Sequence, residues 1–341
     1  MKCIETIHAV GHMLCHDLTR IVPGERKDAA FRKGHIVTEA DIPMLLSMGK
    51  DHLFVWEMDE NMLHENDAAD RLAALCESAY MHRTPVKEGK IELIADCAGL
   101  FSVDAARLNA VNAVDEVMIA TRHNNTPVHA GDKLCGTRVI PLVIEKARLA
   151  EAAAAAGNEP LLTLMPFRAG LRAGIVTTGN EVAAGRITDK FTPVVVEKLA
   201  AYGVTAAAHR VTDDDAAHIM AAIEAVRAEK VDMVLCTGGM SVDPDDRTPA
   251  AIRDSGAGIV TYGAPVLPGA MFLLGYYGDG VPVMGLPGCV MYARASIFDL
   301  VLPRIVAGVR MEKRDFTRMG CGGLCLGCET CTFPNCGYGK H

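Results

Sequence analysis

The chain has 341 residues, and half of them are hydrophobic, so a sizeable core can form. At roughly 100–200 residues per domain, this length predicts two or three domains. The net charge of −8, without a basic stripe, argues against a nucleic-acid partner bound through its phosphates. No apolar run approaches the ~20 residues of a membrane span, and the N-terminus does not have the pattern of a signal peptide. We therefore expect a cytoplasmic protein with no membrane partner, in which the twelve cysteines are buried thiols or metal ligands rather than disulfides.

The first half of the chain predicts a mixed α+β region over residues 1–165. Phe31–Val55 has the pattern of turn, strand, helix and strand, and Met118–Ile144 that of strands around turn-rich segments. "RLAEAAAAAGNEP" favours a helix that ends at Gly157, with Pro160 beyond it, and marks a boundary. We also consider a division into two subdomains near residues 60–90.

From Arg172 the pattern becomes regular, with apolar strands alternating with amphipathic helices. The expected strands are "AGIVTTG", "VTAAAHRV", "VDMVLC", "GIVTYG", "AMFLLGYYG" and "VPVMGLPG". The expected helices are "KFTPVVVEKLAAYG", the segment 212–230, a short helix with Thr248 as N-cap and Pro249 at N1, and a long helix over Cys289–Gly308. This alternation predicts a doubly wound α/β domain with a mostly parallel sheet over residues 166–310.

Polar, glycine-containing loops follow three of these strands. In a doubly wound sheet, ligands bind beyond the carboxyl ends of the strands. The loop "TGGMSVDPDDRTP" offers Gly238 and Gly239 for close approach of an anion to backbone N–H groups, and the Ser241 hydroxyl. Its carboxylates suit Mg²⁺ beside a phosphate and belong to Asp243, Asp245 and Asp246. "TTGNE" (177–181) and "GLPG" (285–288) resemble it chemically, and the latter is expected to enter the long helix. The structural alternative is a polar turn before a helix.

The order "TTGNE … DDD … CTGGMSVDPDDRTP … LPG … GLPG" resembles the molybdopterin-binding domain of molybdenum-cofactor biosynthesis proteins. The span from about Ala173 to Gly308 is similar to the molybdopterin molybdenumtransferases of the MoeA and gephyrin E-domain type. "TTGNE" matches the family's T-G-D-E and "TGGMS" its S-G-G-V-S, whereas "DDRTP" is closer to the related adenylylating branch. The N-terminal "HAVGHMLCHDLTR" resembles the family's opening A-x-G-x-x-L-A-x-D.

This resemblance implies a transferase that binds adenylylated molybdopterin and molybdate, releases AMP with Mg²⁺ and leaves molybdenum on the dithiolene. Carried over by motif, Glu181 and Asp246 are the catalytic, Mg²⁺-directed carboxylates, and Asp243 is a further Mg²⁺ ligand. The residues expected to bind molybdopterin are Thr178, Gly179, Asn180, Gly238, Gly239, Ser241, Pro287 and Gly288. A homodimer and a molybdoenzyme client are expected partners.

The sequence departs from the family motifs at four positions. Asn180 replaces an aspartate, Ala270 replaces the lysine of P-G-K-P, and Cys289 and Val290 replace the last two residues of G-L-P-G-N-P. The losses at Asn180 and Ala270 favour a second hypothesis, a non-catalytic carrier or sensor of molybdopterin or the finished cofactor. Glu181 and the intact "DPDD" favour the enzyme. A nucleotide-cleaving relative that acts on another substrate is a third alternative.

The tail, residues 311–341, is predicted to be a separate metal-binding segment. Five cysteines lie within sixteen positions: Cys321, Cys325, Cys328, Cys331 and Cys336. The spacing C-x2-C-x2-C-x4-C resembles that of iron–sulfur proteins and would suit a 4Fe–4S cluster, and the same thiols could form a four-cysteine Zn²⁺ site. The structural alternative is a disordered tail of free thiols.

Overall fold

A computed structural model describes residues 2–20, 28–55, 61–241, 243 and 246–340. The chain forms two compact units. The first consists of residues 1–96, 103–122 and 131–163, and the second of residues 97–102, 123–130 and 164–341. Two short segments inside the predicted N-terminal region therefore belong to the second unit.

The N-terminal part of the first unit is a small mixed fold with a core of its own. Its elements are β1 (Lys2–Glu5), η1 (Thr6–His8), β2 (Leu18–Arg20), β3 (Asp28–Phe31), η2 (Glu39–Asp41), α1 (Ile42–Ser47) and β4 (His52–Val55). β1 pairs antiparallel with β4, and β2 with β3. Leu14, Leu45 and Leu53 are buried together in this core.

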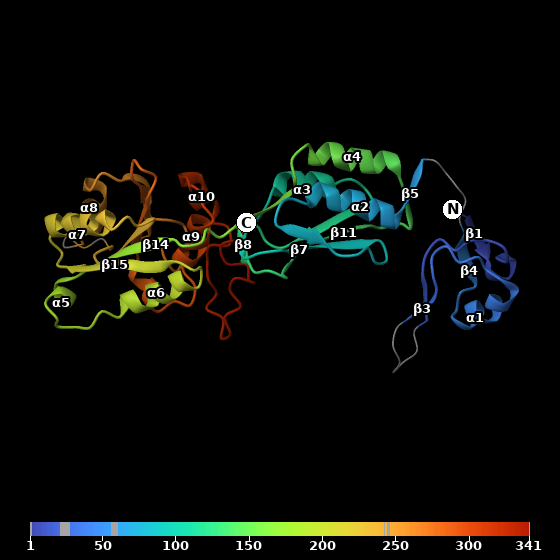
Figure 1. Ribbon diagram of the computed structural model, residues 1–341, viewed down its shortest axis with the longest axis horizontal. Coiled ribbons are helices and arrows are strands. Elements are labelled where there is room, and N and C mark those ends of the chain that lie inside the picture. The colour runs from blue at the N-terminus through green and yellow to red at the C-terminus, as the bar shows by residue number, and fades with distance from the viewer. Residues whose placement is uncertain (1, 21–27, 56–60, 242, 244–245, 341) are drawn as a thin grey trace. The chain divides into compact units, whose positions relative to one another are not determined.

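The rest of the first unit is built on a four-stranded antiparallel sheet of order β6-β7-β11-β9. The elements are β5 (Met62–His64), α2 (Glu65–Cys76), β6 (Met81–Arg83), β7 (Lys90–Ala95), α3 (Ala105–Asn112), β9 (Val117–Thr121), β11 (Lys133–Val139), β12 (Val143–Glu145) and α4 (Lys146–Ala156). α2 packs on β7 and β11, and α3 packs on α4 (Figure 1). Gly157 has a φ of 72° and ends α4, as the sequence predicts. β8 (Gly99–Val103), β10 (Thr126–Val128) and β13 (Leu162–Pro166) form a separate three-stranded sheet, most of whose residues belong to the second unit.

The second unit is a six-stranded sheet of order β15-β14-β16-β19-β18-β17 with helices on both faces. Its elements are β14 (Arg172–Thr178), α5 (Asn180–Ala183), α6 (Phe191–Ala200), β15 (Thr205–Thr212), α7 (Ala216–Ala228), β16 (Met233–Thr237), α8 (Thr248–Asp254), β17 (Gly258–Tyr262), β18 (Leu273–Tyr276), β19 (Pro282–Leu286), η3 (Gly288–Met291), α9 (Ile297–Val306) and α10 (Lys313–Arg318). The first four strands pair in parallel, and β18 pairs antiparallel with both of its neighbours, β19 and β17. The predicted α/β class with a mostly parallel sheet is confirmed for this unit.

The central strands are buried on both faces because their alternate side chains enter two cores. Ile175 and Leu235 join the core under α6 and α9, whereas Val176 and Val234 join the core under α7 and α8. Figure 1 shows α6 on one side of the sheet and α7 and α8 on the other. This explains the nearly continuous apolar runs of these strands.

Two predicted helix starts are wrong. The long helix over Cys289–Gly308 is a short 3-10 turn, η3, followed by α9 from Ile297. Asp299 accepts hydrogen bonds from the Ser296 backbone N–H (2.8 Å) and hydroxyl (3.0 Å), and this capping box begins the helix anew. At α8 the N-cap is Arg247, so Thr248 lies inside the first turn.

The tail is part of the second unit rather than a separate domain. Phe316, Met319 and Tyr338 are buried in the same core as Phe298, and Cys325 and Cys336 pack against that core. The alternative of a disordered tail therefore does not describe this structure.

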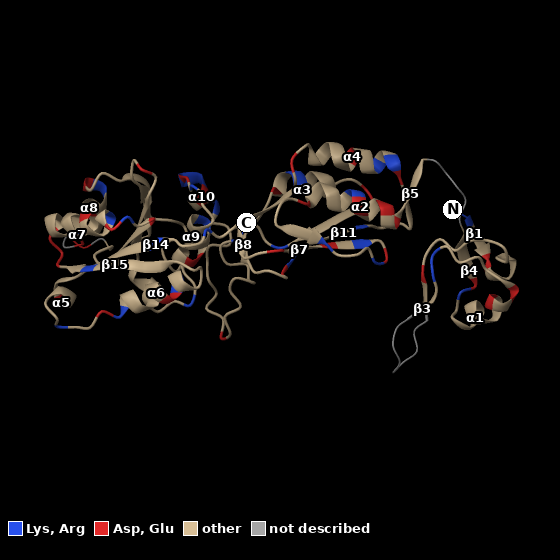
Figure 2. Cartoon of the chain, viewed as in Figure 1, with Lys and Arg blue, Asp and Glu red and all other residues tan. Residues whose placement is uncertain are grey.

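None of the helices that the structure describes combines the length and apolar character needed to cross a membrane. Figure 2 shows Lys and Arg interspersed with Asp and Glu, mostly outside the strands of the six-stranded sheet.

Truncating a central strand residue should weaken the second unit strongly. Leu235→Ala removes a fully buried side chain from β16, and we expect a loss of about 3 kcal/mol in the free energy of unfolding. The control Val211→Ala lies on the edge strand β15 and is 45% exposed, so its cost should stay near 0.5 kcal/mol, roughly the surface value. Urea unfolding followed by circular dichroism measures both; equal losses would contradict the two-sided core.

Candidate functional site

The carboxyl ends of β14, β16 and β19 lie side by side. Thr177 is paired in register with Thr237, and Thr237 with Leu286. The loops that follow these three strands therefore leave the sheet at one edge, which is where doubly wound proteins bind ligands.

The two glycines after β16 allow the loop to fold back on β14. Gly238 has a φ of 86°, and a Cβ there would collide with the Thr178 carbonyl oxygen. Gly239 has a φ of 54°, and a Cβ there would lie 2.7 Å from the Thr248 hydroxyl oxygen, which is itself 3.1 Å from that of Thr178. The space beside these glycines is thus filled by the protein's own atoms, and glycine is required there for packing.

A cavity of about 410 Å³ opens beyond these glycines, and we call it the glycine-loop cavity. Its lining brings together six of the residues expected to act: Gly238, Gly239, Ser241, Asp246, Pro287 and Gly288. Tyr262 donates a hydrogen bond from its hydroxyl to the Met240 carbonyl oxygen (3.1 Å) and so positions the Ser241 loop. Burial, reinforced by Asp246, raises the pKa of Tyr262, which keeps that hydroxyl protonated and able to donate.

The glycine-loop cavity has both polar and apolar lining residues. Asp246 is half-buried and contributes the cavity's carboxylate, while Met240, Met271 and Leu286 contribute apolar surface. Ala270 also lines it, and none of its described lining residues is Lys or Arg. Burial raises the pKa of the Cys289 thiol, so this residue lines the cavity as a neutral group.

A second cavity of about 570 Å³ shares Gly238 with the first; we call it the threonine cavity. Its lining includes Thr177, Thr178 and Thr237, together with Asp189 and Lys190, which sequence reasoning missed. Asp189 stands in the turn "TDK", directly before a helix. An acidic residue at such a helix start is a local signal that could have indicated this site.

A hydrogen-bonded network lies at the threonine cavity. The Thr177 hydroxyl lies 2.9 Å from that of Thr192 and 3.0 Å from His209 Nε2. Asp189 accepts the backbone N–H groups of Phe191 (2.8 Å) and Thr192 (3.0 Å) at the start of α6. Burial alone would raise the pKa of Asp189, but hydrogen bonds from Thr192, Phe191 and Thr177 outweigh it and hold that pKa below its usual value.

Four predicted site residues line neither cavity: Gly179, Asn180, Glu181 and Asp243. The Asn180 backbone N–H donates to Asp214 Oδ2 (3.0 Å), and the Asp214 N–H donates to Asn180 Oδ1 (3.4 Å), so Asn180 pairs with the loop before α7. Glu181 is exposed on α5, and Asp243 is exposed. Asp245 lies outside the described residues. Pro287 and Gly288 do line the glycine-loop cavity, but no long helix starts there, so the expected helix-dipole contribution is missing.

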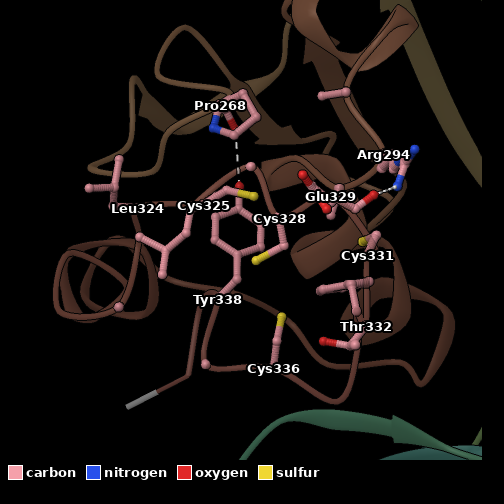
Figure 3. A pocket seen from close by; sticks show the side chains of 17 residues that line it. Pro268, Arg294, Leu324, Cys325, Cys328, Glu329, Cys331, Thr332, Cys336 and Tyr338 are labelled. Atoms are coloured by element: carbon pink, nitrogen blue, oxygen red, sulfur yellow. Dashed lines mark hydrogen bonds between the residues drawn. The ribbon is translucent and has the colours of Figure 1, made fainter.

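The tail cysteines line a third cavity, of about 720 Å³, which we call the cysteine cavity. Figure 3 shows the sulfur atoms of Cys325, Cys328, Cys331 and Cys336 around it, whereas Cys321 is exposed and is not among its lining residues. Within the described part of the chain, no three His, Cys, Asp or Glu side chains come together closely enough to hold a metal ion. The expected single-ion sites, for Zn²⁺ at the thiols and for Mg²⁺ at Glu181, Asp243 and Asp246, are therefore not formed by the described residues.

Two family models match the chain. One, described as "Domain of unknown function (DUF8806)", matches residues 3–57, and one, described as "Probable molybdopterin binding domain", matches residues 174–307. Neither description names a molybdenumtransferase, so the assignment of the chain to that type of enzyme stays a prediction.

Individual relatives match part of the chain. A "Molybdenum cofactor biosynthesis bifunctional protein" of Synechococcus elongatus is 38% identical over 89 residues, 26% of this chain and 28% of that protein. A "CinA-like protein" of a Mycobacterium species is 38% identical over 81 residues, 24% of this chain and 19% of that protein. The matched stretch is thus less than a third of either relative.

Among solved structures, the molybdopterin biosynthesis enzyme MoaB of Thermus thermophilus aligns with a TM-score of 0.34 and 24% identity, covering 40% of this chain and 97% of that one. By sequence, the six-stranded sheet and its glycine-loop cavity lie in a segment, residues 174–307, that is similar to the family of probable molybdopterin binding domains.

Proposed function

We propose that the second unit binds molybdopterin or its adenylate and acts in molybdenum cofactor biosynthesis. The observation that carries this proposal is the glycine-loop cavity, because six residues chosen from two separate motifs line it. The match of residues 174–307 to a probable molybdopterin binding domain supports the same ligand.

The cavity has groups for both ends of such a ligand. The Ser241 hydroxyl and the backbone N–H groups of the glycine loop can donate hydrogen bonds to phosphate oxygens. The side chains of Met271 and Tyr292 offer apolar surface for a pterin ring, and Tyr292 is 75% exposed and open to a ring stacking on it. The ligand would therefore lie with its phosphate toward β16 and its ring toward β19 and η3.

For the reaction, we propose insertion of molybdate with release of AMP. Mg²⁺ binds proteins through one or two carboxylates plus substrate phosphates, and Asp246 fits this mode in the glycine-loop cavity. When bound, Mg²⁺ neutralises phosphate charge. Glu181 follows β14 at the same edge but lines neither cavity, so the catalytic proposal rests on Asp246. Molybdate, a homodimer and a molybdoenzyme client remain predictions.

The second candidate function is a carrier or sensor that binds molybdopterin without turnover. Ala270 lines the glycine-loop cavity where the family motif has lysine, and the described lining residues include no other Lys or Arg. Asn180, which replaces the motif's aspartate, is engaged with Asp214. At both positions the sequence lacks a charged side chain that a phosphate-cleaving site would use.

Filling the glycine-loop cavity should weaken ligand binding while the fold survives. A Cβ at Gly288 meets no atom within 4 Å, so Gly288→Val places its methyl groups in open space of the cavity. We expect affinity for molybdopterin to fall at least tenfold, or about 1.4 kcal/mol. The matched control is Gly278→Val, since Gly278 is exposed, has equally open space and lines neither cavity. Anaerobic titration measures both; unchanged binding by a folded Gly288→Val protein would refute this site.

Removing the carboxylate separates the two candidate functions. If the protein is an enzyme, Asp246→Asn should reduce AMP release by at least about a hundredfold with nearly unchanged pterin affinity, because its charge acts on the transition state. AMP formation from adenylylated molybdopterin is followed with molybdate and Mg²⁺ present. A wild-type protein that binds the adenylate tightly but releases no AMP would establish the carrier instead.

Restoring the missing cation should tighten binding. Ala270→Lys adds an ammonium group to the wall of the glycine-loop cavity, and we expect affinity for a phosphate-bearing pterin to rise about tenfold, an effect that salt weakens. Ala270→Met is the control for side-chain length without charge. Equal affinities of the two variants would show that the phosphate does not approach position 270.

A further inference from the structure

We propose that the cysteine cavity holds a 4Fe–4S cluster ligated by Cys325, Cys328, Cys331 and Cys336. These four residues form the C-x2-C-x2-C-x4-C part of the tail, and all four line one cavity of about 720 Å³. Figure 3 shows their sulfur atoms directed into the space between them. The site lies outside the glycine-loop cavity and does not depend on the proposed function.

The walls of this cavity are fixed by the core of the second unit. The backbone N–H of Leu267 donates to the Gly323 carbonyl oxygen (2.7 Å), and that of Cys325 donates to the Leu267 carbonyl oxygen (2.8 Å). Gly339 N–H donates to the Gly322 carbonyl oxygen (2.9 Å) and joins the two ends of the tail. A Cβ at Gly322 would lie 2.7 Å from the Lys340 carbonyl oxygen, so this close approach requires glycine. Cys325 and Cys336 also pack against the core of the second unit, so two of the four thiols are held in place before any cluster binds.

The spread of the thiols favours a cluster over one Zn²⁺ ion. Tetrahedral Zn²⁺ with bonds of about 2.3 Å draws four sulfurs to within roughly 3.8 Å of one another. In the described chain, no three potential ligands are gathered in a way that could hold one ion. The four cysteines instead surround an open volume, and a cluster fills such a volume with its own iron and sulfide while its thiolate ligands stand apart.

The surroundings suit an anionic cluster. Arg294 lines the cavity and donates from Nη1 to the Glu329 carbonyl oxygen (3.0 Å), which places a cation at the rim and supports the turn between Cys328 and Cys331. Tyr338, whose hydroxyl donates to the Pro268 carbonyl oxygen (3.1 Å), forms a buried wall. Tyr338 thus closes one side of the cavity, and Arg294 adds a cation to a rim that also carries Glu329. Solvent access and nearby charge are the properties by which proteins tune iron–sulfur clusters.

Two backbone segments separate this cavity from the glycine-loop cavity. Pro268 lines the cysteine cavity, and Ala270 and Met271 line the other. Likewise, Tyr292 lines the glycine-loop cavity and Ala293 the cysteine cavity. A cluster would therefore brace the same segments that form the wall of the proposed pterin site.

The test uses the full chain, reconstituted without oxygen with ferric iron, sulfide and a thiol that reduces part of the iron to the ferrous state. We expect iron and acid-labile sulfide at about four each per chain, a broad visible absorption, and a paramagnetic signal after reduction by dithionite. In the double variant Cys328→Ser/Cys331→Ser these should be lost; both side chains are exposed, so the core is untouched. Near-ultraviolet circular dichroism checks the fold.

Cys321→Ser is the matched control, because Cys321 belongs to the same tail but does not line the cavity. It should retain the cluster in full. Three results would overturn the proposal: a wild-type chain that takes up no sulfide, a double variant that keeps its iron and sulfide, or one tightly bound Zn²⁺ per chain that blocks cluster assembly. The first and third would leave the pterin-binding experiments unaffected, so the two proposals fail independently.

Discussion

The burial of β14, β16 and β19 on both faces is the constraint on which the rest of the second unit depends. Alternate side chains of each strand enter a core under α6 and α9 or a core under α7 and α8. Such strands can shift neither along nor across the sheet without exposing apolar surface, so their carboxyl ends stay level. The loops after Thr178, Thr237 and Leu286 consequently meet at one edge, and each of the two cavities there takes residues from more than one strand end.

The glycines at the centre of this edge serve the fold first. Gly238 and Gly239 let the loop after β16 lie directly on the end of β14, where the hydroxyls of Thr178 and Thr248 meet. The structural interpretation of the motif as a turn and its interpretation as a binding site are therefore compatible. Packing fixes Gly238 and Gly239, and Ser241 and Asp246 line the glycine-loop cavity beside them. A ligand then binds a surface whose ordering cost has already been met by folding.

The tail is likewise held in place by packing. Phe316, Met319 and Tyr338 anchor it in the core of the second unit, and its backbone is bonded to the loop at Leu267. This anchoring gives the cysteine cavity a defined wall and places it on the other side of the segments that line the glycine-loop cavity. The family model for residues 174–307 ends before the tail, so the cysteine cavity is an addition to the matched domain.

The sequence by itself determined the strand and helix alternation, the mostly parallel sheet and the three polar loops, because apolar periodicity and glycine or proline signals act over a few residues. It also identified six residues that line one cavity. Only the tertiary structure decided the rest. The last long helix begins at the capping box formed by Ser296 and Asp299. Asn180 is hydrogen-bonded to Asp214, in the loop before α7. Asp189 lines the threonine cavity, and His209 contacts the Thr177 hydroxyl there. Whether the tail thiols surround a cavity depends on packing against residues far away in the chain, and local pattern carries no information about such contacts.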